Sequence, residues 1–140
     1  MSKKLYFIIP FLVLMLVFGL ISCGNDKNEE IKNYLDEFNK IKNKFMDKYE
    51  LAGTTARIAL SPVISNMQDI KRDLENLDPP ENVDRLIGVK ELCLYGMDKA
   101  IEGFQEFQME NESKSLLLLD EADGIFISVD NTINEIKEEL

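Results

Sequence analysis

Apolar residues recur every three or four positions along the chain from about residue 30 to its end, and this period is the strongest constraint on the fold. Such spacing places side chains on one face of an α-helix, whereas a half-buried strand needs strict alternation. No stretch of useful length alternates in that way, and no internal repeat has a fixed period. The sequence therefore predicts an all-α protein.

The apolar period divides into four amphipathic segments, predicted as helices over about 27–50, 55–77, 80–109 and 113–138. The inner faces are predicted to be Ile31, Tyr34, Leu35, Phe38, Ile41, Phe45 and Tyr49 in the first helix; Val63, Met67, Ile70, Leu74 and Leu77 in the second; Val83, Leu86, Ile87, Cys93, Leu94, Met97, Ala100, Ile101, Phe104 and Phe107 in the third; and Leu118, Leu119, Ala122, Ile125, Phe126, Val129, Ile133 and Ile136 in the fourth.

Glycine and proline mark the predicted connections. Gly53 and the threonines after it predict a turn at 52–54, so that Pro62 would lie inside the second helix and bend it. The alternative is that Ser61 and Pro62 themselves begin that helix. The firmest loop is 78–81, because the residue before a proline avoids helical geometry, and Pro80 would then open the third helix.

Four amphipathic helices with short connections favour antiparallel neighbours. We therefore predict an up-down-up-down four-helix bundle over residues 29–140, the alternative being a three-helix bundle with a loosely attached first helix. The third helix contains Gly88, Gly96 and Gly103, although glycine costs about 1 kcal/mol relative to alanine inside a helix. Three explanations for these glycines are open: they allow close helix approach, they bend the helix and open a cavity, or they are tolerated positions of low stability.

The N-terminal segment has the pattern of a secretory signal: Lys3 and Lys4, then an apolar run from Leu5 to Ile21, then small Ser22. The four residues Leu20, Ile21, Ser22 and Cys23 resemble the lipobox of bacterial lipoproteins. The resemblance implies that residues 1–22 are a signal peptide that is removed and that a diacylglycerol is attached to the sulfur of Cys23.

The lipobox resemblance also implies a cellular location. Residues 23–28 would be a lipidated polar tether, and the domain would be held outside the cytoplasm on a bacterial cell membrane or outer membrane. An uncleaved membrane helix over residues 5–22 and an ordinary cleavage site before Cys23 are the competing interpretations. With an uncleaved helix, Lys3 and Lys4 stay cytoplasmic and the rest of the chain is again outside.

The chain is acidic, with 16 basic and 26 acidic residues and a net charge of −10. Removal of 1–22 takes two lysines and no acid, which leaves 14 basic and 26 acidic residues and a net charge of −12. Such a charge argues against nucleic acid as a partner, since binding needs a basic face. It also keeps the domain off anionic lipid, so that the membrane is contacted through the anchor.

The residue types of most catalytic sites are missing. The chain has no histidine, which removes the commonest general base and an important zinc ligand. After acylation of Cys23, Cys93 is the remaining thiol, and its place on an apolar stripe predicts a buried, unreactive group. The acidic stretch 120–124 lacks the ligand spacing of a calcium loop. We predict no cofactor, no metal site and no enzymatic activity.

Two surfaces are candidates for binding. Glu102, Glu106 and Glu110 share one helix face and form either an acidic patch for a cationic partner or a solvated outer face. Four aromatic residues form either a ligand pocket or plain core: Tyr95, Phe104, Phe107 and Phe126.

The prediction for function is a non-catalytic binding or interaction module of unknown protein or small-molecule ligand. A structural envelope component or surface antigen is the alternative, and a carboxylate-based hydrolase is a remote one. Residues 61–138 are similar to small helical-bundle lipoproteins of bacteria that remain uncharacterised, a resemblance that implies no functional residues.

Overall fold

A computed structural model describes the backbone of residues 8–140 and the side chains from Gly24 onward. Residues 1–7 lie outside it, as do the side chains of the predicted signal peptide and lipobox. The described helices are α1 (Ile8–Thr54), α2 (Leu60–Glu75), α3 (Asp84–Gln108) and α4 (Glu112–Glu138), with a short 3₁₀ turn η1 (Arg57–Ala59) before α2. No strand occurs within 8–140.

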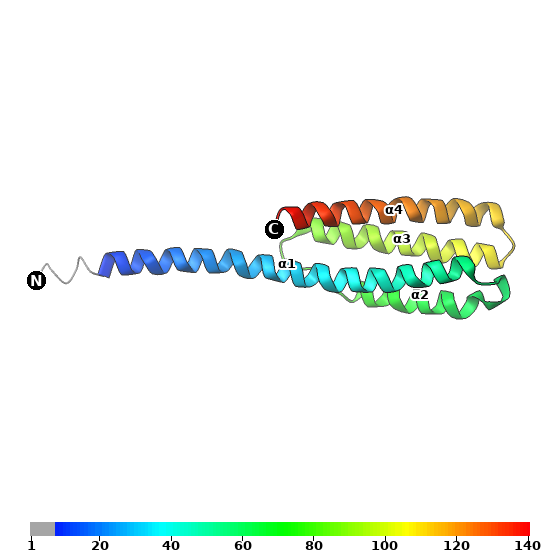
Figure 1. The fold of residues 1–140 in the computed structure, drawn as a ribbon, viewed down its shortest axis with the longest axis horizontal. Coiled ribbons are helices and arrows are strands. Elements are labelled where there is room, and N and C mark those ends of the chain that lie inside the picture. Colours follow the sequence, from blue (N-terminus) through cyan, green and yellow to red (C-terminus); the bar gives the residue numbers. More distant parts are fainter. Residues whose placement is uncertain (1–7) are drawn as a thin grey trace, which may run out of the picture.

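The helices form an up-down-up-down bundle, as predicted (Figure 1). The N-terminal part of α1 extends well beyond the other three helices, on the side where the C-terminus lies. The α1–α2 and α3–α4 connections meet at the opposite end of the bundle. We call that end, formed by residues 55–59 and 109–111 and the helix termini beside them, the loop end.

The core runs along the bundle axis and includes α1 throughout its bundled length. Phe38 and Phe45 of α1 are fully buried, as are Met67 of α2 and Met97 of α3. The Phe45 ring also packs against the Phe126 ring of α4, with centroids 6.0 Å apart. The first helix is therefore an integral member of the bundle, which excludes the three-helix alternative for the described residues.

Helices α3 and α4 approach each other most closely, and two glycines explain why. A Cβ atom at Gly96 would lie 2.8 Å from Cγ2 of Ile125, and one at Gly103 would lie 2.7 Å from Cδ2 of Leu119. A Cβ at Gly88 would meet nothing within 4 Å. Close helix approach thus accounts for Gly96 and Gly103, whereas Gly88 has no packing role.

The first two helices differ from their predicted limits. Helix α1 begins at Ile8, not near residue 27, and the segment predicted as a tether is helical and mostly exposed over 24–28. It also continues through the predicted turn at 52–54, and the hydroxyls of Thr54 and Thr55 donate to the Leu51 carbonyl there. Pro62 lies in the first turn of α2, where its missing N–H costs nothing.

The third helix begins at Asp84, four residues later than predicted. Pro80 is buried in the loop, and Asn82 has a positive φ of 61° that reverses the chain before the helix starts. Lys90 of α3 caps the C-terminus of α2. Its Nζ donates to the carbonyls of Glu75 and Leu77 at 2.8 and 2.7 Å. A cation suits a helix C-terminus in this way.

Candidate binding pocket at the loop end

Polar contacts tie the two connections of the loop end together. Arg57 of η1 forms ion pairs with Glu112 at 2.9 Å and with Glu110 at 3.4 Å. Its guanidinium lies 4.6 Å from the centroid of the Phe107 ring, a cation–π contact. The Nε–H of Arg57 is buried without a hydrogen-bond partner among the described residues. One arginine thereby orders both connections against each other.

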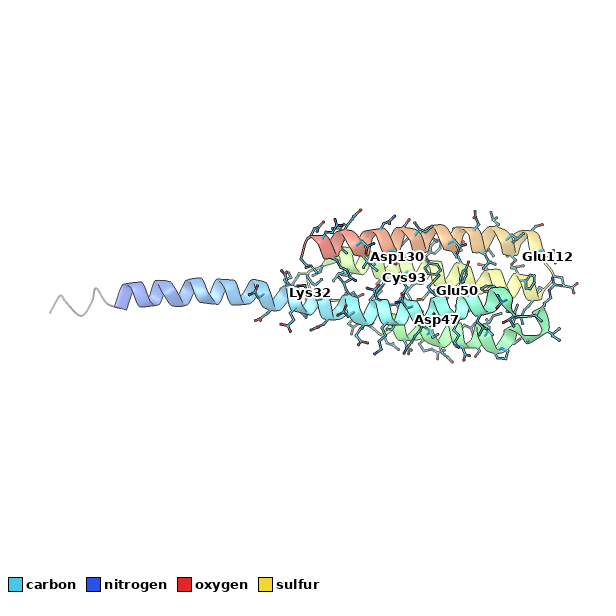
Figure 2. The ribbon with its side chains drawn as sticks, viewed as in Figure 1. Lys32, Asp47, Glu50, Cys93, Glu112 and Asp130 are labelled. Carbon is cyan, nitrogen blue, oxygen red and sulfur yellow. The ribbon has the colours of Figure 1, made fainter. Side chains whose placement is uncertain are left out.

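A pocket of about 200 Å³ opens at the loop end. We call it the tip pocket; it is lined by Ala52 and Gly53 of α1, Phe104 and Phe107 of α3, and Glu112, Ser115, Leu116 and Leu119 of α4. Figure 2 shows Glu112 at this end of the bundle. All but two of these residues are apolar or lack a side chain, so the pocket suits an apolar group.

Small residues leave the space for this pocket. Gly53 has no side chain, and a Cβ built there would meet nothing within 4 Å. Ser115 is a small buried residue on the facing helix. Phe107 forms part of the wall and is held in place by Arg57. The pocket thus follows from side chains that are too short to fill the gap between α1 and α4.

Large apolar side chains are exposed at the same end. Ile58 of η1 is 96% exposed, Leu116 at the pocket is 69% exposed, and Met109 after α3 is 65% exposed. Single exposed apolar residues are ordinary on a protein surface, whereas apolar residues gathered around a pocket mark an interaction site.

The glutamates predicted to share one face of the third helix are paired at the loop end. Lys114 of α4 forms ion pairs with Glu106 at 2.6 Å and Glu102 at 3.2 Å. Its hydrogen bond lowers the pKa of Glu106. Glu110 has a positive φ of 65° and pairs with Arg57. These carboxylates therefore belong to the network that builds the loop end, rather than to a free acidic stripe.

A second hollow, of about 360 Å³, lies between α2 and α3 and is larger but charged. Lys71 lines it and forms ion pairs with Asp98 at 2.8 Å and with Glu75 at 2.9 Å. The hydrogen bond that the Lys71 ammonium donates to Asp98 is the main cause that raises the pKa of Lys71. Its charged groups satisfy one another, so the tip pocket is the better candidate site.

Polar contacts also bridge α1 and α4 along the middle of the bundle. Lys42, a buried lysine, pairs with Asp130, and the hydroxyl of Tyr49 donates to Asp123 at 2.8 Å. Figure 2 shows Asp130 and Cys93 in this central region. Cys93 is fully buried, as predicted. Burial raises the pKa of its thiol to about 12, which makes it a poor nucleophile.

Stability is expected to fall in alkaline solution because of two buried groups. Burial raises the pKa of Cys93 from 9.0 to about 12 and that of Tyr34 from 10.0 to about 12. Above about pH 9 the unfolded chain loses these protons first, so the free energy of unfolding decreases as pH rises toward about 12. Urea unfolding across this range measures the decrease. Cys93→Ala should show a smaller decrease, and an equal one would contradict the assignment to the thiol.

In comparisons with known proteins, no family model, no curated protein and no solved structure matches this chain. Over residues 24–140, whose side chains the structure describes, no helix has both the length and the apolar character to cross a membrane. The described residues also contain no group of three or more potential metal ligands.

The structure separates the four aromatic residues singled out in the sequence. Phe104 and Phe107 line the tip pocket, Phe126 packs in the core, and Tyr95 is on the surface, where its hydroxyl donates to Glu121 at 3.0 Å. The interpretation as core holds for Phe104 and Phe126, whereas Tyr95 belongs to neither a pocket nor the core; a ligand role for Phe104 and Phe107 stays a prediction. Gly53, Ser115 and Leu116 were not predicted as pocket residues, since two are small and the third is off the predicted stripe.

Proposed function

We propose that the chain is a lipid-anchored binding module that acts outside the cytoplasm and holds a partner in the tip pocket without catalysing a reaction. The observation that carries the proposal is the apolar pocket at the loop end together with the exposed Ile58, Met109 and Leu116 near it. A purely structural helical protein gains nothing from leaving such a surface open to solvent.

The place of the pocket supports this role. The loop end is the end of the bundle farthest from the N-terminal extension of α1 (Figure 1). If Cys23 carries the lipid and residues 1–22 are removed, residues 23–28 join the membrane to the end of the bundle opposite the loop end, and the tip pocket is directed away from the membrane. The acidic surface also separates the bundle from the membrane, because it is repelled by anionic lipid.

A non-catalytic role is supported by the chemistry of the pocket. Among the described residues that line it, Glu112 is the one acid, and it is occupied by Arg57. Hydrolysis by carboxylates requires two acids flanking the scissile bond. The pocket offers shape and apolar contact, which serve binding.

Cys23→Ala is expected to block acylation and to leave residues 1–22 attached, because the substitution removes the sulfur that would carry the lipid and the cysteine that completes the lipobox pattern. Mass spectrometry of the protein from its own membranes measures both effects at once. Cys93→Ala is the matched control and should be processed like the native chain. Normal processing of Cys23→Ala would rule out the lipobox interpretation.

Native mass spectrometry of the membrane-extracted protein tests the binding role. We expect the acylated chain with an additional bound species. Gly53→Trp should lose that species, because the new side chain starts in open space beside the pocket and covers it. Gly88→Trp is the control, since its site is equally open but lies near the start of α3, away from the pocket. The acylated chain alone in every sample would favour a structural role.

A further inference from the structure

The volume of the tip pocket limits what can occupy it. Pockets that enclose drug-sized ligands have volumes of about 300–1,000 Å³, whereas the tip pocket has about 200 Å³. It therefore accommodates one or two apolar side chains rather than a whole small molecule. Anchor side chains that insert into such pockets contribute most of the affinity of many protein–protein interfaces.

The surroundings of the pocket extend the contact area in the way a protein partner requires. Ile58 and Met109 belong to the two connections of the loop end, and Leu116 lines the pocket itself. These side chains come from three separate segments, and each of them is exposed at the loop end. A central pocket with apolar residues around it is the arrangement of a binding hot spot.

The charge of the loop end indicates the sign of the charge that a partner should carry. Residues 50–60 and 102–116 contain five glutamates and two basic residues. Arg57 is already shared between Glu110 and Glu112, and Lys114 between Glu102 and Glu106. The excess is negative and no cation is left over within these two segments. A basic partner is therefore favoured, and complementary charge also speeds association.

The same charge argues against two other occupants. A second copy of this chain carries a net charge of −10 and would bring its own glutamates against these, which is unfavourable. An anionic lipid would place its head group beside Glu112 at the pocket. Neither has the complementarity that a basic polypeptide has.

We infer that the tip pocket receives an apolar side chain of a partner polypeptide whose flanking residues are basic. The inference rests on the proposed function, since it specifies the partner of that same site. It predicts that apolar contact in the pocket provides most of the affinity. It also predicts that the negative charge of the loop end favours partners with basic flanking residues. Binding should accordingly weaken as ionic strength rises, because exposed charges are screened.

Three labelled peptides and one lipid test the inference on the mature acylated protein in nanodiscs of zwitterionic lipid. The peptides share a central pair of leucines and are flanked by lysine, by glutamine or by glutamate; laurate serves as the anionic lipid. Fluorescence anisotropy gives the affinities, and the methyl resonances of Leu116 and Leu119 report where binding occurs. Gly53→Trp is the blocked variant, and Gly88→Trp is its control.

The expected result is that the lysine peptide binds about tenfold or more tighter than the glutamate peptide. Binding should shift the methyl resonances of Leu116 and Leu119 and should be lost in Gly53→Trp alone. Equal binding of all three peptides at the pocket, or tighter binding of laurate, would overturn the inference and leave the binding role intact. No binding by any probe would overturn both.

Discussion

Phe45→Ala is expected to lower the free energy of unfolding by about 3–5 kcal/mol, the range for removing a phenylalanine side chain from a packed core. Phe45 is fully buried in the C-terminal part of α1, and its ring packs against that of Phe126 on α4. The substitution removes these contacts and leaves a cavity between the two helices. Denaturation by urea, followed by circular dichroism, measures the change.

Ile127→Ala is the matched control for this substitution, because Ile127 is 62% exposed on the outer side of α4. Surface changes of this kind usually shift stability by less than about 0.5 kcal/mol. A loss below about 1 kcal/mol for Phe45→Ala would mean that α1 contributes little to the bundle. Such a result would favour the alternative arrangement, a three-helix bundle with a loosely attached first helix.

Gly103→Leu is expected to lower the free energy of unfolding by about 3 kcal/mol, the upper part of the range for overpacking. A Cβ at Gly103 would already be 2.7 Å from Cδ2 and 2.9 Å from Cγ of Leu119. The larger side chain forces α3 and α4 apart along their closest contact. Gly96→Leu should act in the same direction, since its Cβ would meet Ile125 at 2.8 Å.

Gly124→Leu provides the opposite result in the same pair of helices. A Cβ at Gly124 meets nothing within 4 Å, so the substitution adds helix propensity without strain and should raise stability by up to about 1 kcal/mol. Thermal unfolding of the two variants side by side measures the difference in sign. If both variants changed stability in the same direction, close approach would not explain Gly103.

The apolar period determined most of the fold. Its spacing identified four helices and nearly all of the buried residues, because a helical stripe has one face that must leave water whatever its neighbours are. The least accurate predictions were the helix ends. At these positions, side-chain hydrogen bonds and turn geometry compete with the helical backbone hydrogen bonds, and the two differ little in free energy. Within α3, Ile87 was predicted to be inside but is 41% exposed, while Val89 is buried. The two positions lie on opposite edges of the stripe, and packing chose between them.

The candidate site followed less directly from the sequence. Phe104 and Phe107 were named as one of two alternatives, but helical spacing alone does not distinguish a pocket wall from a core. Gly53 of α1 and Ser115 of α4, which are distant in sequence, both line the pocket. A cavity forms where small residues leave space between helices. The apolar period of a sequence does not predict where such residues come together.

The sequence by itself determined the helical class, the acidic surface, the lack of histidine chemistry and the lipobox pattern, since each depends on residue type and local spacing. The tertiary structure decided which helices approach closely, how Arg57 joins the two connections, and where apolar surface stays open. These features depend on distances between residues far apart along the chain, and those distances are fixed only when the helices pack.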